Sequence, residues 1–548
     1  MATYTKVWAE DTSKLNKLEL AKLEKDGLDV IADVYRYANL GFDAITPDDM
    51  DRFKWAGIYQ QKPKTGHFMM RVRIHSGVLS TKQARAIAGI SRDYGRNLID
   101  VTTRQAVQFH WLQIQDMPDI FGRLAAVGLS SFEACGDCPR TFIGNPLAGI
   151  DPDELMDTRP LIEELSKALH LNREFSNLPR KYKVSLSANV YNTSHAEIND
   201  LAFVPATKEI DGEEVVGFHI LVGGGLSTKP HLALPIDIFV RPEDVVKVAL
   251  GVTTIFRDYG YREKRTHARF KFLVADWGAD TFLEKLTEII GPMPSRGVDQ
   301  GKGWNAGYFT GVHPQKQEGL SYIGLSIQVG RLSAEELFEL ADLADRYGNG
   351  ELRTCNSQNI ILPNIPNEKI DEVLAEPLLK RLTPFPKLFA GHVISCTGNE
   401  FCNLAVTETK ERMKAISNYL DEHVELDTPV RIHVNGCPNS CGQQQIADIG
   451  LQGALVKKPD GVRDAFDIFV GGTLGPDARF NTKLKGRVEG DLVGPVLERL
   501  ILFYKTERTP NELFYQFVAR VGIPAMQQKL DQAIAEVAEV QEVAAGKE

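Results

Sequence analysis

Seven cysteines occur in the 548-residue chain, and four of them lie in two local pairs. Cys396 and Cys402 bound the segment CTGNEFC, while Cys437 and Cys441 lie in NGCPNSC. Four thiolates brought together in two pairs can surround one metal centre, either a single tetrahedral ion or an iron–sulfur cubane. Structural zinc sites usually have other spacings, and buried thiols seldom have Gly, Pro and Asn on every side. The pattern therefore favours an iron–sulfur cluster over structural zinc.

The elements that would position these cysteines recur along the chain as an internal repeat. Residues 79–95 read LSTKQARAIAGISRDYG, and residues 332–348 read LSAEELFELADLADRYG. Each copy has a serine, Ser80 or Ser333, followed three residues later by Gln or Glu, which is a capping-box pattern. Each copy also ends in a glycine, where a helix C-cap is expected. The sequence therefore predicts one similar helix in each copy.

A second pair of matching segments lies farther along the chain. INDLAFVP begins at Ile198 and IADIGLQG at Ile446, while GFHILVGGG begins at Gly217 and AFDIFVGGT at Ala465. Both pairs share one offset, and two well-separated blocks with a common offset seldom match by chance. The chain is therefore predicted to be a tandem duplication whose halves face each other across a pseudo-twofold axis.

Within each half, short β-branched runs alternate with amphipathic helices, which predicts an α+β fold. In the first half, 68–77 is expected to be a strand, 80–94 a helix and 97–114 further strands. The duplicated halves span about 68–310 and 318–510.

The overall composition limits the possible functions. Hydrophobic residues make up 43% and charged residues 25% of the chain, values typical of a globular protein. A net charge of -10 argues against a role that depends on nucleic acid. No apolar run is long enough for a membrane helix, and the N-terminus lacks the apolar core of a signal peptide. We therefore expect a cytoplasmic monomer whose cysteines form no disulfide framework.

The cysteine spacing, the NGCPNSC segment and the duplication together resemble the sirohaem and [4Fe–4S] family of assimilatory sulfite and nitrite reductases. The resemblance extends from about Ala38 to about residue 515. It implies pseudo-twofold related halves, each with a ferredoxin-like domain and a domain that binds sirohaem or the iron–sulfur cluster. The implied division is an N-terminal extension at 1–67, ferredoxin-like half-domain 1 at 68–128, sirohaem and substrate domain 1 at 129–310, ferredoxin-like half-domain 2 at 318–384, [4Fe–4S] and sirohaem domain 2 at 385–515, and a C-terminal helical tail at 516–548.

The resemblance also assigns cofactor ligands to individual residues. The four paired cysteines would hold the cubane, and Cys441 would also bridge the cluster to the sirohaem iron. The segment VTTRQAVQFHW at 101–111 resembles the family segment that binds sirohaem carboxylates. Members of the sulfite-reducing branch can carry an additional Arg where this chain has Asp100. The implied sirohaem-binding residues are Thr102, Arg104, Gln108, Asn435 and Cys441.

Four cations of the first half match the cage that, in this family, surrounds the open iron position. Each cation taken alone is more simply explained as a solvated surface charge. Together, they would attract an anion and neutralise the oxyanion charge that develops on it, and a lysine could also donate protons. The four implied catalytic residues are Arg71, Arg140, Lys181 and Lys183.

The three remaining cysteines have no assigned role. Cys135 and Cys138 lie just before Arg140, so a redox disulfide or a zinc site is conceivable and Cys135 is expected near the haem pocket. Cys355 is matched with Arg104 of the first half and is interpreted as a relic of the duplicated cofactor segment.

The substrate prediction depends on the pattern Lys181–Tyr182–Lys183. The sulfite branch typically keeps both lysines, and sulfite has more negative charge than nitrite near neutral pH. We therefore expect six-electron reduction of sulfite to sulfide. The segment GNPLAGID at 144–151 resembles the nitrite branch, so reduction of nitrite to ammonia is the alternative. A non-catalytic iron–sulfur or zinc protein is a remote alternative.

No flavin-binding or nicotinamide-binding segment is evident, so electrons are expected from a separate donor. The resemblance implies ferredoxin, with a flavodoxin-like donor as the runner-up. The basic segment YREKRTHARFK at 261–271 is one candidate docking face. A solvated charged face or a cofactor contact would explain the segment equally well.

Overall fold

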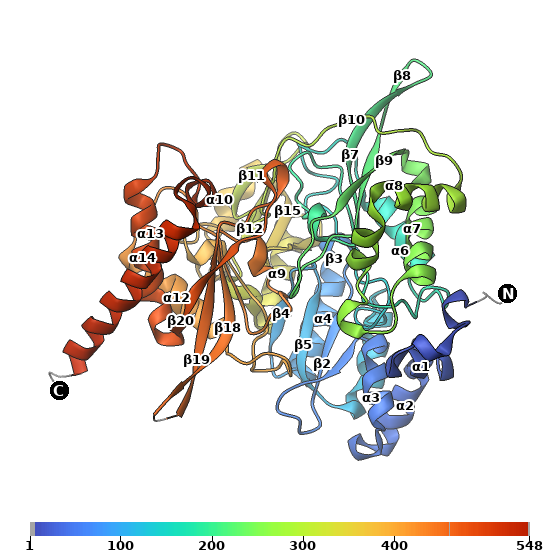
Figure 1. The fold of residues 1–548 in the computed structure, drawn as a ribbon, viewed down its shortest axis with the longest axis horizontal. Helices are drawn as coiled ribbons and strands as arrows, with labels where there is room; N and C mark the ends of the chain where they lie inside the picture. Colours follow the sequence, from blue (N-terminus) through green and yellow to red (C-terminus); the bar gives the residue numbers. More distant parts are fainter. Residues whose placement is uncertain (1–5, 460, 546–548) are drawn as a thin grey trace.

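The computed structural model describes residues 6–459 and 461–545. Four five-stranded sheets organise this part of the chain (Figure 1). The first sheet has the order β1-β2-β5-β4-β13 and the second has the order β11-β12-β15-β14-β3. Their strands are β1 (Ile58–Gln60), β2 (Phe68–Val72), β3 (Val78–Ser80), β4 (Ile99–Val101), β5 (Val107–Leu112), β11 (Gly311–Pro314), β12 (Leu320–Leu325), β13 (Arg331–Leu332), β14 (Glu351–Thr354) and β15 (Ile360–Pro366).

The two halves exchange one short strand each. Strand β3 of the first half pairs with β14, where Leu79 lies opposite Leu352. Strand β13 of the second half pairs with β4, where Leu332 lies opposite Ile99. Because the exchange is reciprocal, each of the first two sheets is completed by the opposite half. This arrangement is what a pseudo-twofold relation between duplicated halves predicts.

The repeated helices follow the exchanged strands. They are α4 (Thr81–Tyr94) and α9 (Ala334–Tyr347), and both begin with the predicted capping box. The hydroxyl of Ser80 accepts from the amide of Gln83 at 3.2 Å, and the hydroxyl of Ser333 accepts from that of Glu336 at 3.1 Å. These bonds satisfy amide groups that a helix leaves unpaired at its start. The helices pack on each other and share one apolar core with the first two sheets.

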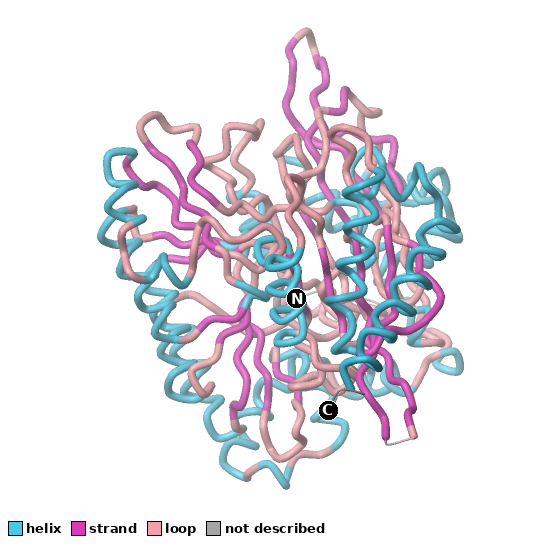
Figure 2. The backbone as a smooth tube through the Cα atoms, turned by 90° about the vertical axis from the view of Figure 1, so that its left-hand side faces the viewer, coloured by secondary structure: helices cyan, strands magenta, loops and turns pink. Residues whose placement is uncertain are grey.

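The third and fourth sheets form the outer parts of the two halves. In the third, the order is β10-β7-β8-β9, and β6 pairs with β7; in the fourth, it is β16-β17-β18-β19-β20. The long hairpins β7–β8 and β18–β19 extend at opposite ends of the molecule (Figures 1 and 2). The strands are β6 (Val184–Leu186), β7 (Leu201–Ile210), β8 (Glu213–Val222), β9 (Leu234–Val240), β10 (Val298–Asp299), β16 (Val393–Ser395), β17 (Ile432–Asn435), β18 (Ile449–Lys458), β19 (Gly461–Val470) and β20 (Thr482–Glu489).

Helices cover one side of each outer sheet and bury its apolar side chains. The third sheet packs against α6 (Arg159–Leu169), α7 (Val245–Tyr259) and α8 (Phe270–Ile290). The fourth packs against α12 (Lys410–His423), α13 (Val493–Glu507) and α14 (Phe514–Ala545). The remaining helices are α1 (Lys17–Glu24), α2 (Val30–Leu40), α3 (Pro47–Arg52), α5 (Met117–Ala125), α10 (Ile370–Leu374) and α11 (Leu378–Arg381). Within the described residues, no helix is long and apolar enough to cross a membrane.

Two residues at equivalent positions of the two halves, 248 residues apart, contact each other. The ring Nδ1 of His195 lies 3.2 Å from the side-chain oxygen of Gln443. Both residues have left-handed backbone conformations, with φ of 53° and 60°. Non-glycine residues seldom adopt this conformation, so its recurrence at both positions indicates that the two halves share one local geometry.

Candidate functional site

The two cysteine pairs meet because the strands before them are parallel neighbours. Strand β16 ends directly before Cys396, and β17 ends two residues before Cys437. Val393 pairs with Ile432 in parallel register, so both strands end at the same edge of the fourth sheet. Cysteines separated by a helix in the sequence are thereby brought to one place.

Backbone amides point at the cysteine sulfur atoms, as the turn residues around them predict. The amides of Gly398 and Gly436 donate to Sγ of Cys396 at 3.4 and 3.3 Å, and the side-chain amide of Asn439 lies 3.6 Å from Sγ of Cys437. A side chain at Gly398 would be strained, because φ is 70° and its Cβ would lie 2.5 Å from Oγ1 of Thr409. The glycine is therefore required for this turn.

The donor set suits an iron–sulfur cluster. Burial raises the pKa of Cys396 to about 12, so its proton must be displaced by a metal for the thiolate to form. Hydrogen bonds to sulfur stabilise the reduced, anionic state of such a cluster. Cys441 is exposed, so its thiol is accessible to a further group.

Asn435 closes the second cysteine loop. Its side-chain oxygen accepts from the amide of Gly442 at 2.6 Å, and its amide donates to Gln444 at 2.6 Å. Both polar ends of this buried side chain are therefore engaged within the protein. Asn435 thus orders the loop that ends in Cys441.

Arg71 is joined to the cysteine loops through Gln108. Strands β2 and β5 place these residues opposite each other, and Arg71 donates to the Gln108 oxygen at 2.6 and 3.1 Å. The Gln108 amide in turn donates to Oγ1 of Thr397 at 3.3 Å, directly after Cys396. Two residues predicted from the first half thus lie beside the proposed cluster ligands of the second half.

Thr102 and Arg104 lie in a turn that also contacts the cysteine loop. The hydroxyl of Thr102 accepts from the amides of Arg104 and Ala106, both at 3.2 Å, and so fixes the turn. Thr103 donates to the carbonyl of Cys441 at 2.9 Å. Thr103 is thus a further residue at this site, and its place between Thr102 and Arg104 is the only signal of it in the sequence.

Arg104 is a half-buried cation with an incomplete set of partners. It donates to Asn199 at 3.0 Å and to the carbonyl of Thr141 at 2.7 Å, while its Nε is buried without a hydrogen-bond partner among the described residues. Burial, together with nearby Arg140 and Arg71, lowers the pKa of Arg104 to about 9. A carboxylated ligand such as sirohaem fits this site, because its negative charges would pair with these cations.

Arg140 and the two lysines lie on adjacent segments. Pro139 pairs with Tyr182 in a parallel bridge, and the amide of Arg140 donates to the carbonyl of Tyr182 at 2.8 Å. The guanidinium of Arg140 donates to backbone carbonyls of its own loop, including that of Gly136 at 2.7 Å. Lys181 and Lys183 flank Tyr182 in the neighbouring segment, so all three predicted cations share this region.

The two lysines carry unpaired ammonium groups. Throughout the described part of the chain, neither ammonium donates a hydrogen bond to a protein acceptor, and both side chains are half-buried. Burial and the guanidinium of Arg269 lower the pKa of Lys181 to about 7. Burial, with Arg104 and Lys181 nearby, lowers the pKa of Lys183 well below its usual range. An anion bound here would favour the charged form of both groups.

The basic segment at 261–271 turns inward rather than forming a free docking face. Arg265 pairs with Asp137 at 2.7 Å, and Arg269 pairs with Asp200 at 3.0 Å. The ammonium of Lys271 donates to the carbonyl of Leu226 at 3.0 Å. Most of its predicted charge is therefore used inside the protein, and Arg269 becomes a further cation beside Lys181.

Asp100 links the two halves. It lies in β4, is 2% exposed and accepts from Arg331 at 2.9 and 3.2 Å. It also lies 3.5 Å from the ammonium of Lys410 and 3.2 Å from His110. Burial alone would raise its pKa, but these cations hold the pKa well below its usual range. The carboxylate of Asp100 thus forms ion pairs with Arg331 and Lys410, two cations of the second half.

The prediction that Cys355 corresponds to Arg104 is wrong. The amide of Cys355 donates to the carbonyl of Asn359 at 2.9 Å, as the amide of Thr102 donates to that of Ala106 at 2.8 Å. Equivalent turns thus align Cys355 with Thr102, which leaves Ser357 at the position of Arg104. The sequence comparison placed Cys355 two residues out of register, because the turns at 102–106 and 355–359 have few side chains in common.

Cys135 lies beside a group of neighbouring cations from the first half, here called the cation cluster: Arg71, Arg104, Arg140, Lys181, Lys183 and Arg269. Its sulfur accepts from Arg71 at 3.4 Å. Cys138 instead lies against the backbone, with its sulfur 2.9 Å from the carbonyl of Cys135. Both thiols are free and buried.

Comparison with known families covers most of the chain. The nitrite and sulphite reductase 4Fe-4S domain matches residues 135–291 and 390–537. The nitrite/sulfite reductase ferredoxin-like half domain matches residues 59–127 and 313–379. Each domain type therefore occurs twice, which confirms the duplicated α+β fold.

Individual relatives are similar over nearly their whole length. A ferredoxin–nitrite reductase from Synechococcus elongatus is 43% identical over 90% of this chain and 97% of its own. The chloroplastic ferredoxin–nitrite reductase of Zea mays is 42% identical over 89% of each chain. The solved structure of the Mycobacterium tuberculosis NirA protein has a TM-score of 0.88 and 35% identity, and the match covers 94% of this chain and 97% of that one.

The prediction of sulfite as the substrate is wrong. Relatives at 38–43% identity are ferredoxin–nitrite reductases, which favours the nitrite alternative. Arg71, Arg104 and Arg269 lie in the same cluster as Lys181 and Lys183, so the count of two lysines does not measure the charge that an anion would meet.

Family membership supports the two expected cofactors, sirohaem and a [4Fe–4S] cluster, and an oxidoreductase activity. The thiol groups with N–H donors and the buried cations with unpaired N–H groups agree with these cofactors. The chain therefore belongs to the nitrite and sulphite reductase 4Fe-4S family.

Proposed function

We propose that this protein is a ferredoxin-dependent nitrite reductase, which reduces nitrite to ammonia with six electrons. The observation that carries the proposal is the similarity over almost the full length to ferredoxin–nitrite reductases. The unpaired ammonium groups beside the cysteine loops support an anionic substrate at this place.

The cofactors would be held by residues from both halves. Cys396, Cys402, Cys437 and Cys441 are proposed to ligate the cluster, and Cys441 also to link it to the sirohaem. When bound, the sirohaem supplies the iron at which nitrite is reduced, and the cluster supplies electrons singly. Thr102, Arg104, Gln108 and Asn435 are proposed to bind the sirohaem, and Asn435 also orders the loop before Cys441.

The cations would bind the anion and supply protons. Arg71 and Arg140 are held in fixed positions by hydrogen bonds to Gln108 and to the loop at 134–136. Fixed donors stabilise charge that develops on the nitrite oxygens before these leave as water. Lys181 and Lys183 lack protein acceptors in the described structure, so their ammonium groups can turn toward the anion. Lys181, with a pKa of about 7, is suited to hand over a proton near neutral pH.

The remaining expectations are also proposals. The electron donor is proposed to be a ferredoxin, as in the names of the relatives. We propose that the protein works as a monomer in the cytoplasm. The domain boundaries given by the sequence are proposed without change.

Turnover by the purified holoenzyme tests the function. Chemically reduced ferredoxin is supplied with either nitrite or sulfite, and ammonia and sulfide are measured. We expect ammonia production from nitrite to exceed sulfide production from sulfite. A cofactor-replete protein that forms no ammonia from nitrite would overturn the proposed function. A protein that is colourless after anaerobic purification would contradict the proposal that it binds sirohaem.

A further inference from the structure

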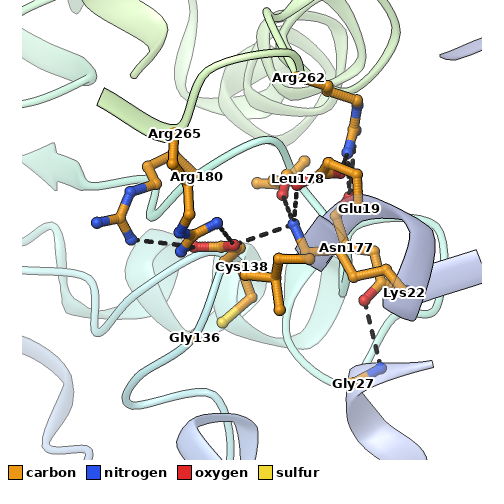
Figure 3. A network of polar contacts seen from close by, with 12 residues as sticks. Glu19, Lys22, Gly27, Gly136, Cys138, Asn177, Leu178, Arg180, Arg262 and Arg265 are labelled. Carbon is orange, nitrogen blue, oxygen red and sulfur yellow. Dashed lines mark hydrogen bonds and ion pairs between the residues drawn. The ribbon is translucent and has the colours of Figure 1, made fainter. Parts of the chain in front are cut away.

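The N-terminal extension reaches the base of the cation cluster through one buried lysine. Lys22 lies on α1 and is 3% exposed. Its ammonium lies 3.0 Å from the carboxylate of Asp137 and 2.5 Å from that of Glu19, and it donates to the carbonyl of Leu178 at 2.9 Å. Figure 3 shows Lys22 between the segment around Gly136 and Cys138 and the segment around Asn177 and Leu178. One side chain of the extension thus contacts two segments of the first half.

Both contacted segments lead directly to proposed catalytic residues. Asp137 precedes Arg140 by three residues, and Leu178 precedes Lys181 by three residues. The segments are hydrogen-bonded to each other, because the amide of Leu178 donates to the carbonyl of Asp137 at 2.8 Å. Lys22 therefore holds the two segments at the point where they first meet.

Asp137 has enough other partners to remain paired without Lys22. The carboxylate is 1% exposed and also lies 2.7 Å from Arg265 and 3.3 Å from Arg180. Burial alone would raise its pKa, but the three cations hold it well below its usual range. Loss of Lys22 would leave a paired carboxylate, so the fold should survive its removal. The specific loss is the link to the carbonyl of Leu178.

Helix α1 is itself held firmly against the first half. Glu19 is fully buried and pairs with Arg262, which also donates to the carbonyl of Asn177 at 3.2 Å. The amide of Gly27 donates to the side chain of Asn177 at 3.3 Å. The helix therefore has a fixed position relative to the segment before Lys181. The ion pair between Lys22 and Asp137 links the segment before Arg140 to this same helix.

We propose that Lys22 is a positioning residue for the anion site: from the N-terminal extension, it sets the separation between the segment that carries Arg140 and the segment that carries Lys181 and Lys183. This inference rests on the proposed nitrite-reductase function. Lys22 touches neither substrate nor cofactor in this role. Its effect should appear as weaker binding of an anion, with little effect on a neutral ligand at the same iron.

The test compares an anionic and a neutral ligand in purified holoenzyme. Nitrite affinity is measured from the Soret shift of oxidised enzyme, and carbon monoxide affinity from that of reduced enzyme. For Lys22→Met, we expect the nitrite Kd to rise about ten-fold, since a shift of about 1 Å in a distant support can cost two orders of magnitude. The carbon monoxide Kd should stay within about two-fold, because a neutral ligand gains little from the cations. Lys17→Met is the matched control, because Lys17 lies on the same helix but is exposed.

A second readout needs no cofactor. Hydrogen–deuterium exchange of the cofactor-free protein should be faster in 134–141 and 178–183 for Lys22→Met than for Lys17→Met. If Lys22→Met does not yield folded protein, Lys22→Gln takes its place, because it keeps a polar side chain but removes the ammonium that joins Asp137 to Leu178; it should show the same split between nitrite and carbon monoxide.

Three results would overturn the inference. These are an unchanged nitrite Kd, an equal weakening of nitrite and carbon monoxide, and unchanged exchange in both segments. The proposed function fails separately, when the wild-type holoenzyme neither binds nor reduces nitrite.

Discussion

The two halves use the same aspartate position in different ways. Asp200 accepts from the amide of Lys183 at 2.8 Å, and Asp448 accepts from the amide of Arg431 at 2.9 Å, 248 residues later. In the second half, the guanidinium of Arg431 also pairs with Asp448 at 2.8 Å. In the first half, Arg269 takes the carboxylate of Asp200, so the ammonium of Lys183 remains available.

Equivalent glutamines show what the duplication retained. Gln105 exchanges two hydrogen bonds of 3.1 Å with the backbone of Gly144, and Gln358 exchanges two of 3.0 Å with the backbone of Ser395. Both glutamines have left-handed backbone conformations, with φ of 55° and 69°. Ser395 directly precedes Cys396, so one clamp supports the cluster loop and the other supports the segment after Arg140.

The residues that support the backbone are equivalent in the two halves, whereas the residues proposed for the chemistry are not. The aspartates, the glutamines and the capping boxes hold the backbone in both halves. The positions proposed to bind the cofactors differ, since Arg104 corresponds to Ser357 and Cys441 corresponds to Thr193. The two halves thus have similar frameworks, and each is proposed to supply a different part of one site.

The largest expected effect separates Cys441 from its counterpart. Cys441→Ser should lower nitrite turnover by more than about 100-fold, because even indirect supports of a metal site cost 10–100-fold. Thr193→Ser should leave turnover nearly unchanged. Turnover with reduced ferredoxin and the visible spectrum measure both variants. Similar losses in the two would contradict the assignment of the cluster to the second half.

The next effect separates the paired arginine from the unpaired lysine. Arg431→Met should cost about 3–5 kcal/mol of unfolding free energy, because it leaves Asp448 buried without its cation. Lys183→Met should not destabilise the protein, but should lower kcat/KM for nitrite about 100-fold through the lost charge. Denaturant titration and steady-state kinetics distinguish these outcomes. A stability loss of equal size in Lys183→Met would show that its ammonium has a structural partner.

A smaller effect should separate the two glutamine clamps. Gln105→Leu removes two hydrogen bonds to buried backbone, and Gln358→Leu removes three, because Gln358 also donates to the carbonyl of Val101 at 3.0 Å. Each buried group left unpaired should cost about 1–3 kcal/mol. Gln358→Leu should reduce the iron–sulfur content, while Gln105→Leu should weaken nitrite binding about ten-fold with the iron content kept. Iron analysis and spectral titration with nitrite provide the measurements. The division of roles fails if both variants lose iron to the same extent.

The smallest effect should be equal in the two halves. Ser80→Ala and Ser333→Ala each remove a helix cap and should cost about 1 kcal/mol. Neither should change kcat/KM for nitrite, because both hydroxyls are used in capping. Thermal unfolding compares the variants with wild type, and a change in kcat/KM for only one of them would break the expected symmetry.

The sequence determined the duplication, the repeated helices and the paired cysteines. These features depend on local patterns: a serine with Gln or Glu three residues later caps a helix, and glycines beside cysteines turn amides toward sulfur. The substrate was misjudged because the pattern at Lys181–Tyr182–Lys183 records two charges out of a larger cluster. The cations at Arg269 and Arg104 come from other elements, so their contribution depends on the folded chain.

Which of the charged side chains are paired depends on contacts between segments that are distant in the sequence. Arg431 and Lys183 occupy equivalent positions in the chain, yet one is paired and the other is unpaired because Arg269 comes from a helix start far along the sequence. The ion pair between Lys22 and Asp137 likewise joins residues far apart in the sequence, so no local pattern predicts it. Residue types and spacing establish which chemistry is available, whereas burial and partners from distant segments determine which side chains can perform it.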